Sequence, residues 1–306
     1  MPETTGPLPE VLRDPCELRR RLDAARAGGR RVAFVPTMGA LHAGHLELVR
    51  HARELADVVV VSIFVNPTQF GPREDLASYP RDLQTDLRLL AGLADLVLAP
   101  GVEAVYPPGH ATTIHVAGLT EGLCGASRPG HFDGVATVVA KLFSMVGPCS
   151  AVFGRKDFQQ LQVVRRMTVD LDLPVTVVGR PTVREPDGLA MSSRNRHLTP
   201  EERRRATALV EGLRAAAAAF AAGERSVAVL DGLVRAQLEG RVDGIDYVFV
   251  GNPETLQPFA GPVPPGGTML AAVAVRVGRT RLIDNTELGA EDLVVPAGGH
   301  SPGTQD

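Results

Sequence analysis

Two histidines, His42 and His45, stand three residues apart where an apolar run gives way to an amphipathic pattern. Residues 32–36 predict a short buried strand, and the apolar positions 46, 49, 52 and 55 predict a helix after it. Residues 37–41 make the turn between them, so both imidazoles fall on one face of the first helical turn. Because a helix N-terminus presents unpaired N–H groups and a partial positive charge, the pattern indicates a phosphate site.

The histidine pair alone allows three interpretations. In a phosphate site the imidazoles add directional donors, and Gly39 and Gly44 let a nucleotide approach the backbone. A histidine beside a helix start can also be a simple cap or a surface residue. A His-x-x-His pair can bind a metal, but no third Cys, His or carboxylate ligand stands nearby, so no metal site is predicted.

A second polar segment, Met191-Ser192-Ser193-Arg194-Asn195, follows the turn-rich residues 183–188. Two hydroxyls and a guanidinium suit a polyphosphate, because arginine forks onto phosphate oxygens. When the segment is considered alone, a solvated loop with an N-cap serine is the favoured interpretation. Together with the histidine pair it resembles the adenylate-forming nucleotidyl transferases, which carry both elements.

Four blocks narrow this resemblance to the pantothenate synthetase family, also called pantoate–β-alanine ligase. They are residues 35–42, 64–70, 156–161 and 191–195, and their order and approximate spacing agree with that family. The resemblance extends from about residue 30 to 200, and beyond that only length and texture agree. At one position the chain departs: the family usually has Glu where this chain has Arg155. One interpretation of the family's glutamate is that it serves only a local salt bridge. Whatever its role, that role is not assigned to Arg155.

Lysine is scarce in this chain. Only Lys141 and Lys156 are lysines among the 32 basic residues, which leaves 30 arginines. Lys156 follows the apolar residues 151–153, at an expected strand end. A compact ammonium can follow a phosphate that moves during a reaction, whereas a guanidinium is planar and bulkier. We interpret Lys156 as a functional residue, although chance could leave a lysine there.

The first 185 residues alternate strand and helix patterns. Apolar runs at residues 32–35, 58–65, 95–98, 151–153 and 175–178 predict strands, and residues 46–55, 82–92, 134–146 and 157–170 predict helices. This alternation predicts an α/β domain with a doubly wound, Rossmann-like parallel sheet, which binds ligands at the carboxyl ends of its strands. The candidate residues follow successive strands, as this rule requires.

A smaller α+β domain is expected from residue 186 to 290. Thr199 and Pro200 indicate a helix start, with one long helix to about residue 222 and a second over residues 227–239. Strands are predicted at 245–250, 269–277 and 280–284, the last two as a hairpin. We expect this domain and the 191–195 loop to form a lid that hinges at Pro186 and Gly188, and residues 291–306 to be a disordered tail.

Composition fits an ordinary soluble globular protein. The chain has 306 residues, 44% hydrophobic and 22% charged. A net charge of −3 argues against nucleic acid as a partner, and no apolar stretch approaches the ~20 residues that cross a bilayer. Residues 1–10 lack the apolar region of a signal peptide. Three cysteines without a Cys-x-x-Cys pair fit a cytoplasmic location.

The resemblance implies a two-step reaction. Pantoate attacks the α-phosphate of ATP to give pantoyl adenylate and pyrophosphate, and β-alanine then displaces AMP to form pantothenate. His42, His45, Lys156 and Arg194 are the implied catalytic residues, because catalysis rests on positioning and on stabilising phosphate charge. His45 acts either as a proton donor or as an electrostatic stabiliser. Magnesium is expected mainly on the triphosphate, and a homodimer is the expected assembly.

The resemblance also divides the site between nucleotide and acid. Gln69 and Gln160 are expected to bind pantoate, since a primary amide both donates and accepts. Asn66 borders this substrate site and is expected mainly to form the turn before Pro67. Met38 and Val183 offer backbone groups to the adenine or ribose, Met191 packs nearby, and Asp157 orients Lys156 or the ribose. The complete predicted ATP-binding set is Met38, Gly39, Ala40, Leu41, His42, Ala43, Gly44, His45, Gly154, Arg155, Lys156, Asp157, Val183, Met191, Ser192, Ser193 and Arg194.

Two alternatives to this function stay open at the level of sequence. Another nucleotidyl transferase of the same fold would use the phosphate loops without Gln69 and Gln160, and an aminoacyl-tRNA synthetase is disfavoured by the short C-terminal region. A non-catalytic nucleotide-binding protein could also have this fold. The intact set of His42, His45, Lys156 and residues 192–194 speaks against it.

Overall fold

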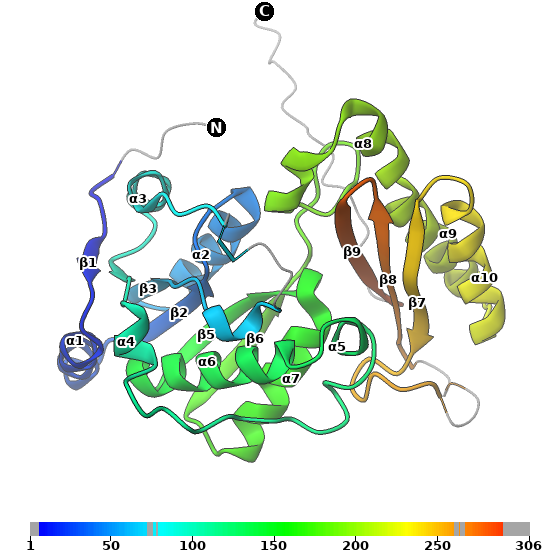
Figure 1. Cartoon of the computed structure of the whole chain (residues 1–306). Coiled ribbons are helices and arrows are strands. Elements are labelled where there is room, and N and C mark those ends of the chain that lie inside the picture. The colour runs from blue at the N-terminus through cyan, green and yellow to red at the C-terminus, as the bar shows by residue number, and fades with distance from the viewer. Residues whose placement is uncertain (1–5, 72–75, 78, 260–262, 264–266, 290–306) are drawn as a thin grey trace, which may run out of the picture.

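The larger sheet has six parallel strands in the order β1-β4-β3-β2-β5-β6 (Figure 1). They are β1 (Glu10–Leu12), β2 (Val32–Thr37), β3 (Val58–Ile63), β4 (Leu96–Leu98), β5 (Cys149–Gly154) and β6 (Val175–Arg180). The computed structural model describes residues 6–71, 76–77, 79–259, 263 and 267–289. All five predicted strands are present. Strand β1 was not predicted, because three residues are too few to show a periodicity.

Helices cover both faces of this sheet, which confirms the doubly wound class. One face carries α1 (Pro15–Ala27), α6 (His131–Val146) and α7 (Phe158–Asp170), and the other carries α2 (Ala43–Leu55) and α3 (Leu83–Leu90). Alternate β2 residues serve the two cores: Phe34 packs in the first and Val35 in the second. Helix α1 was missed because it buries only Leu18 and Leu22 among charged and alanine residues. Two further helices, α4 (Val102–Val105) and α5 (Cys124–Ser127), are single turns.

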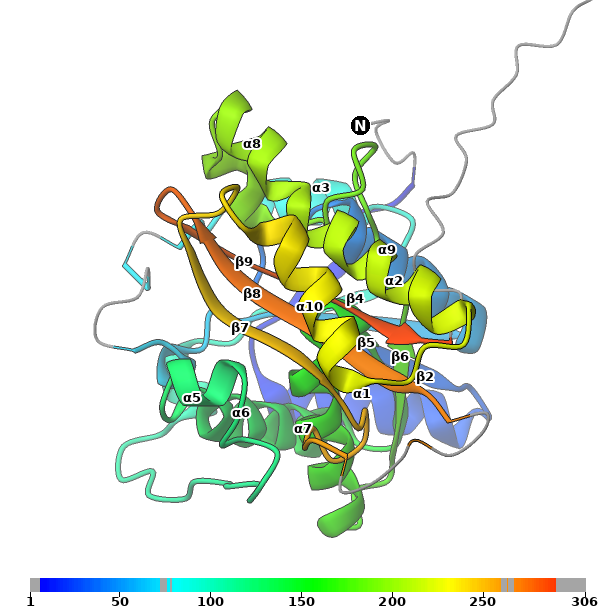
Figure 2. The ribbon, with the colours of Figure 1, turned by 90° about the vertical axis from the view of Figure 1, so that its right-hand side faces the viewer.

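The second sheet is antiparallel, in the order β7-β8-β9, and belongs to the C-terminal region. It comprises β7 (Gly244–Gly251), β8 (Met269–Val277) and β9 (Thr280–Leu288), and α9 (Ala208–Ala221) and α10 (Val227–Leu238) pack on it (Figure 2). The predicted β8–β9 hairpin is confirmed. Strand β9 continues four residues beyond the predicted end at residue 284, and this extension contacts Arg155, which follows β5 of the larger sheet.

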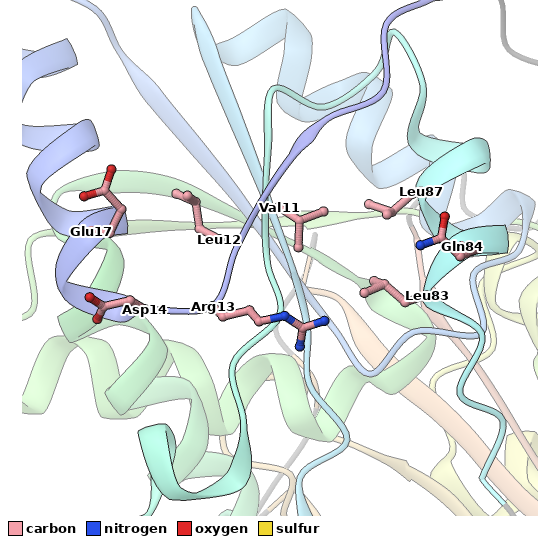
Figure 3. A pocket seen from close by; sticks show the side chains of 8 residues that line it. All are labelled: Val11, Leu12, Arg13, Asp14, Glu17, Leu83, Gln84 and Leu87. Carbon is pink, nitrogen blue, oxygen red and sulfur yellow. The ribbon is translucent and has the colours of Figure 1, made fainter.

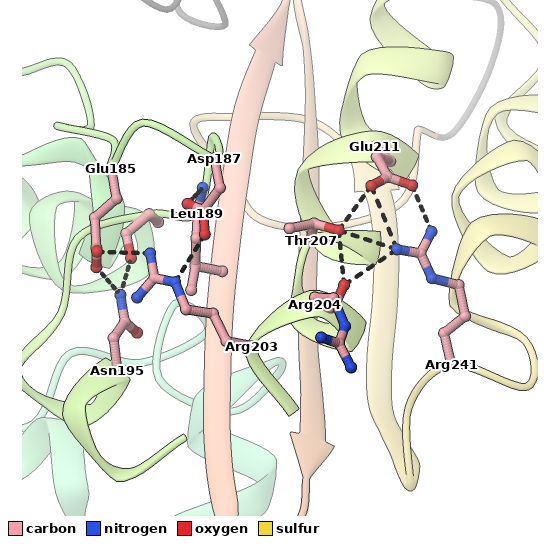
Figure 4. Close-up of polar contacts among 10 residues, drawn as sticks. Glu185, Asp187, Leu189, Asn195, Arg203, Arg204, Thr207, Glu211 and Arg241 are labelled. Atoms are coloured by element: carbon pink, nitrogen blue, oxygen red, sulfur yellow. Dashed lines mark hydrogen bonds and ion pairs between the residues drawn. The ribbon is translucent and has the colours of Figure 1, made fainter. Parts of the chain in front are cut away.

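The prediction of one helix over residues 200–222 is wrong. The segment forms α8 (Pro200–Ala206) and α9, with a break at Thr207. The Thr207 hydroxyl hydrogen-bonds to the carbonyl oxygen of Arg204 and to Glu211, and Arg241 donates to the same hydroxyl (Figure 4). A threonine that bonds back to the preceding turn bends a helix, and here side chains from elsewhere in the domain reinforce the bend.

Two cavities lie away from the residues predicted for the site. One, of about 510 Å³, lies between β1, α1 and α3, where Val11 faces Leu83 and Leu87 (Figure 3). The other, of about 790 Å³, is lined by residues of α1 and α6 and by Leu171 and Leu173. Neither includes a predicted site residue. None of the described helices is long and apolar enough to span a membrane. The predicted disordered tail, residues 291–306, lies outside the described residues.

Candidate active site

Four of the matched segments follow the carboxyl ends of strands. The histidines follow β2, the 3-10 turn η1 (Pro67–Gln69) follows β3, the 3-10 turn η2 (Arg155–Asp157) follows β5, and residues 181–199 follow β6. Because β2, β3, β5 and β6 are parallel and form one continuous stretch of the sheet, these segments gather at one edge.

His42 and His45 begin α2, and their rings lie against each other at an angle of 31°. His42 is the N-cap residue with extended backbone, and the ring centroids lie 4.0 Å apart. The His42 backbone N–H donates to Nδ1 of His45 at 3.3 Å. A neutral His45 that accepts at Nδ1 carries its proton on Nε2. The local backbone therefore selects one tautomer of His45, with an Nε2–H donor.

Both histidines are neutral at pH 7. Burial, aided by the neighbouring His42, lowers the pKa of His45 to about 3. Burial and then the Lys156 charge lower the pKa of His42 to about 4. His45 therefore offers an N–H donor to a phosphate oxygen rather than a resident positive charge. His42 Nδ1 is buried and has no partner within the described part of the chain. A buried polar atom without a partner costs free energy, which a ligand's polar group would recover.

The turn before these histidines is held by Asp86 of α3. Asp86 is only 3% exposed, and its carboxylate accepts from the N–H groups of Ala40 at 3.0 Å and Leu41 at 2.8 Å. The Gly39 N–H donates to Oγ1 of Thr37. Three backbone N–H groups in the predicted ATP-binding set, those of Gly39, Ala40 and Leu41, are thus engaged within the protein and shape the turn.

Asp86 also explains why glycine stands at position 39. Gly39 has φ +80°, and a Cβ there would lie 2.8 Å from Oδ2 of Asp86. Sequence analysis missed Asp86, although a signal was present. It occupies a buried position on α3 beside Leu87 and Leu90, where a charge requires buried donors as partners.

Met191 lies over the start of α2. Its sulfur accepts from the Gly44 N–H at 3.1 Å, and its own N–H donates to the carbonyl oxygen of Val183 at 2.9 Å. The expected packing of Met191 near the nucleotide residues is therefore present. Thioether sulfur is a weak acceptor, so a phosphate oxygen can replace it at this helix N-terminus.

Hydrogen bonds within the loop and to Glu185 hold its remaining residues. Ser192 caps η3 (Ser193–His197) by accepting from the Arg194 N–H at 3.3 Å, as the alternative interpretation of this serine expected. Asn195 is buried and bonds to Glu185, which pairs with Arg203 (Figure 4). Arg194 is exposed.

The hinge predicted at Pro186 and Gly188 does not fit this arrangement. Gly188 is buried, and a Cβ there would lie 3.1 Å from Arg214 and 3.2 Å from Val210. Arg184 donates to the Gly188 carbonyl oxygen and pairs with Asp284 of β9 at 2.7 Å. Residues 184–195 are thus fastened to the C-terminal domain, and Gly188 lies inside this fastened segment.

Lys156 lies in the single turn η2, close enough to both histidines for its charge to lower their pKa values. Its Nζ is 3.9 Å from Oδ2 of Asp157, beyond hydrogen-bond distance, and a role of Asp157 in orienting the lysine stays a prediction. Gly154 ends β5 and precedes this turn. Arg155 pairs with Glu287 of β9 at 2.9 Å. Here the residue that departs from the family pattern makes an ion pair between the two domains.

Asn66 has no amide group left for a substrate. It is 1% exposed; Oδ1 accepts from Thr68 and Tyr106, and Nδ2 donates to Gln69 Oε1 and to the Gly134 carbonyl oxygen. It caps η1, which agrees with its interpretation as a turn former. In this structure Asn66 orients Gln69, and its part in substrate binding stays a prediction.

Gln69 and Gln160 differ in their surroundings. Gln69 Nε2 donates to the sulfur of Met38 at 3.0 Å, which brings the expected adenine-side and pantoate-side residues together. The Gln69 carbonyl oxygen lies 2.8 Å from Nδ1 of His131, whose Nε2 faces Arg128. Gln160 on α7 is half-buried, and the described residues provide no hydrogen-bond partner for its amide. Its neighbour Gln159 is buried and bonds to residues 119–124.

Several of these residues could not be found from their sequence patterns. Tyr106, Arg128 and His131 lie outside the matched blocks and reach Asn66 and Gln69 only through the fold. The described residues contain no cluster of three or more His, Cys, Asp or Glu that could hold a metal.

The fold, with these side chains gathered at one edge of the sheet, defines an α/β protein with the nucleotidyl transferase fold. The profile of the pantoate–β-alanine ligase family matches residues 10–287. The chain belongs to that family and is an enzyme of the ligase class. It is 53% identical to the pantothenate synthetase of Syntrophotalea carbinolica over 278 residues, covering 90% of this chain and 97% of that one. It is 54% identical to pantothenate synthetase 1 of Bradyrhizobium diazoefficiens over 281 residues, covering 91% and 98%.

Solved structures agree. The crystal structure of pantothenate synthetase from Thermus thermophilus is similar with a TM-score of 0.84 and 49% identity, covering 91% of this chain and 99% of that one. The pantoate–β-alanine ligase of Francisella tularensis, solved with β,γ ATP and β-alanine, has a TM-score of 0.71 and 30% identity, covering 92% and 98%.

Proposed function

We propose that this enzyme uses ATP to condense pantoate with β-alanine, through a pantoyl-adenylate intermediate, and releases pyrophosphate and AMP. The observation that supports this most is the convergence of Lys156 and two neutral histidines at the start of α2. Family membership supports the substrates, and the Francisella relative was solved with an ATP compound and β-alanine. These features suit the transfer of an adenylyl group to a carboxylate.

The chemistry needs no protein nucleophile. The pantoate carboxylate attacks the α-phosphorus, the bond to the bridging oxygen breaks, and pyrophosphate leaves. The β-alanine amine then attacks the acyl carbon of the adenylate, AMP leaves with the bonding electrons, and the amine loses a proton. The protein stabilises the charge that builds on phosphate oxygens. We assign this role to Lys156, the Nε2–H of His45, and Arg194 with the hydroxyls of Ser192 and Ser193.

Nucleotide binding exchanges weak contacts for strong ones. The Gly44 N–H leaves the Met191 sulfur for a phosphate oxygen, and Ser192 gives up its cap at 3.3 Å. Negative phosphate charge beside the histidines opposes the effect of burial and raises their pKa values. Because Nδ1 of His45 accepts from the His42 N–H, His45 serves the phosphates as a hydrogen-bond donor through Nε2.

Magnesium belongs to the substrate in this proposal. Asp157 is the acidic residue paired with Lys156, and its side chain is half exposed. Mg²⁺ prefers several waters and phosphate oxygens to an all-protein cage, so the triphosphate carries the ion. We also propose a homodimer, by family resemblance, and a cytoplasmic location. All three cysteines (Cys16, Cys124 and Cys149) are free thiols, as a reducing compartment requires.

Pyrophosphate exchange into ATP tests the proposed function. Exchange should require pantoate and should fail with other carboxylates. In Gln160→Ala the pantoate concentration for half-maximal exchange should rise about tenfold or more, while ATP affinity stays unchanged, because a substrate-binding amide contributes uniform binding. Calorimetry measures the ATP affinity of the variant.

A matched control is the adjacent Gln159→Ala. Its amide holds residues 119–124, so that variant should lose stability rather than pantoate affinity. A parallel loss of ATP affinity in Gln160→Ala would show that Gln160 does not serve pantoate. Exchange with a different acid would favour another nucleotidyl transferase, and ATP binding without any exchange would favour a non-catalytic nucleotide-binding protein.

The C-terminal domain acts as a lid in our proposal. Pantoyl adenylate is a mixed anhydride that water hydrolyses, so the site must close between the two steps. Arg194 and Arg196 are exposed in this structure. Trypsin should cleave beside them, and saturating ATP should slow this cleavage several-fold because the phosphates engage the loop. Equal cleavage rates with and without ATP would rule the lid out.

A further inference from the structure

One strand of the C-terminal domain binds two separate segments of the active site. Asp284 of β9 pairs with Arg184 below the 191–195 loop, at 2.7 Å. Asn285 and Glu287 contact η2, the turn that carries Lys156. Residues 285 and 287 share one face of β9, because side chains alternate along a strand. The turn that carries Lys156 is therefore held by a strand of the C-terminal domain.

The side-chain amide of Asn285 binds two consecutive backbone carbonyl oxygens of η2. Asn285 is 7% exposed, and its Nδ2 donates to two consecutive carbonyl oxygens, those of Arg155 at 3.1 Å and Lys156 at 2.7 Å. Two bonds from one amide fix two successive peptide planes, and these planes set the direction of the Lys156 side chain.

The turn η2 has few internal hydrogen bonds to fix its conformation. It is a single 3-10 turn of three residues, and such turns have poor internal hydrogen-bond geometry. Each of its carbonyl oxygens has a second lone pair that can accept a donor from outside the turn. Arg155 and Glu287 add an ion pair beside the amide, with both side chains mostly covered. Docking of β9 thus supplies the order that the turn lacks.

We propose that Asn285 is a positioning residue for Lys156, and that docking of the C-terminal sheet on η2 is what aims the ammonium at the phosphates. This rests on the proposed role of Lys156 in adenylate formation. Asn285 reaches the chemistry through the backbone of Lys156. Its loss therefore lowers kcat and leaves the KM for pantoate and the affinity for ATP nearly unchanged.

A double-mutant cycle in the full-length enzyme tests the proposal. Asn285→Ala should lower the rate of pyrophosphate exchange about 10- to 100-fold, the scale on which a misplacement of ~1 Å acts. In the Lys156→Ala background the same change should cost less than about twofold, because the residue being positioned is already absent. Asn285→Ser keeps one donor and should give an intermediate loss with the same dependence on Lys156.

The matched control is Thr286→Val, the next residue along β9. Its hydroxyl is buried without a partner in the described part of the chain, so this isosteric change should leave exchange unaffected. Equal losses in the two Lys156 backgrounds for Asn285→Ala, or for Asn285→Ser if the alanine variant fails to fold, would overturn the proposal. Full activity of Asn285→Ala would also overturn it. If the wild-type enzyme itself showed no pyrophosphate exchange, the proposed function would be wrong.

Discussion

Lys156→Ala is expected to lower the rate of adenylate formation by about 10²- to 10³-fold, the usual cost of losing one preorganised charge stabiliser. The chain should remain folded, because the Lys156 side chain makes no close ion pair; its carboxylate neighbour is 3.9 Å away. Its loss also removes the positive charge that lowers the pKa of His42, so that pKa should rise in the variant. Pyrophosphate exchange measures the rate, and NMR titration measures the histidine.

Lys156→Arg should restore only part of the activity, because a planar fork does not replace a compact charge. The matched control is Lys141→Arg, a change at the other lysine of the chain. Lys141 lies over the Tyr106 ring at 6.0 Å, and an arginine can make the same contact. The control should keep full activity. A fully active Lys156→Arg enzyme would contradict the argument from lysine scarcity.

Asp284→Asn should lower the free energy of unfolding by about 3–5 kcal/mol, the expected cost of leaving one partner of a buried ion pair uncompensated. The side chains of Arg184 and Asp284 are 2% and 0% exposed, so water cannot solvate the charge that remains. The guanidinium Nε has no partner within the described residues, and the other nitrogens keep only the uncharged carbonyl oxygens of Gly188 and Asn285. Urea unfolding followed by circular dichroism measures the loss.

Asp170→Asn is the matched control for this substitution. Asp170 pairs with Arg166 one turn away on α7, and both side chains are about half exposed. Exposed pairs contribute about 0–1 kcal/mol, so the control should change stability little. Losses of similar size in the two variants would show that the Arg184–Asp284 pair is solvated.

Prediction from sequence succeeded best where side-chain patterning is local. The alternation of apolar strands with amphipathic helices led to the parallel sheet, and the position of each polar segment after a strand led to its edge. It failed for β1 and α1 and at Thr207, where the signal is either too short or depends on distant partners. The Thr207 break, for example, involves Arg241 of another segment.

The residue types at the site were determined by the sequence itself. A histidine pair at a helix start, a rare lysine after a strand and a serine–arginine loop each have their chemistry in their own side chains. The sequence did not determine the protonation states of these side chains or the directions in which they point. His45 is neutral because the fold buries it, and the N–H groups of Ala40 and Leu41 are occupied because α3 brings Asp86 beneath them.

Only the tertiary structure decided how the two domains share the site. Asn285 and Glu287 lie about 130 residues from the turn they hold, and Asp284 lies 100 residues from Arg184. No periodicity or motif encodes such a contact, because hydrogen bonds and ion pairs depend on distance in space rather than along the chain. The sequence determined which groups could bind phosphate, and the packing of β9 on η2 and residues 181–199 determined which of them are held in place.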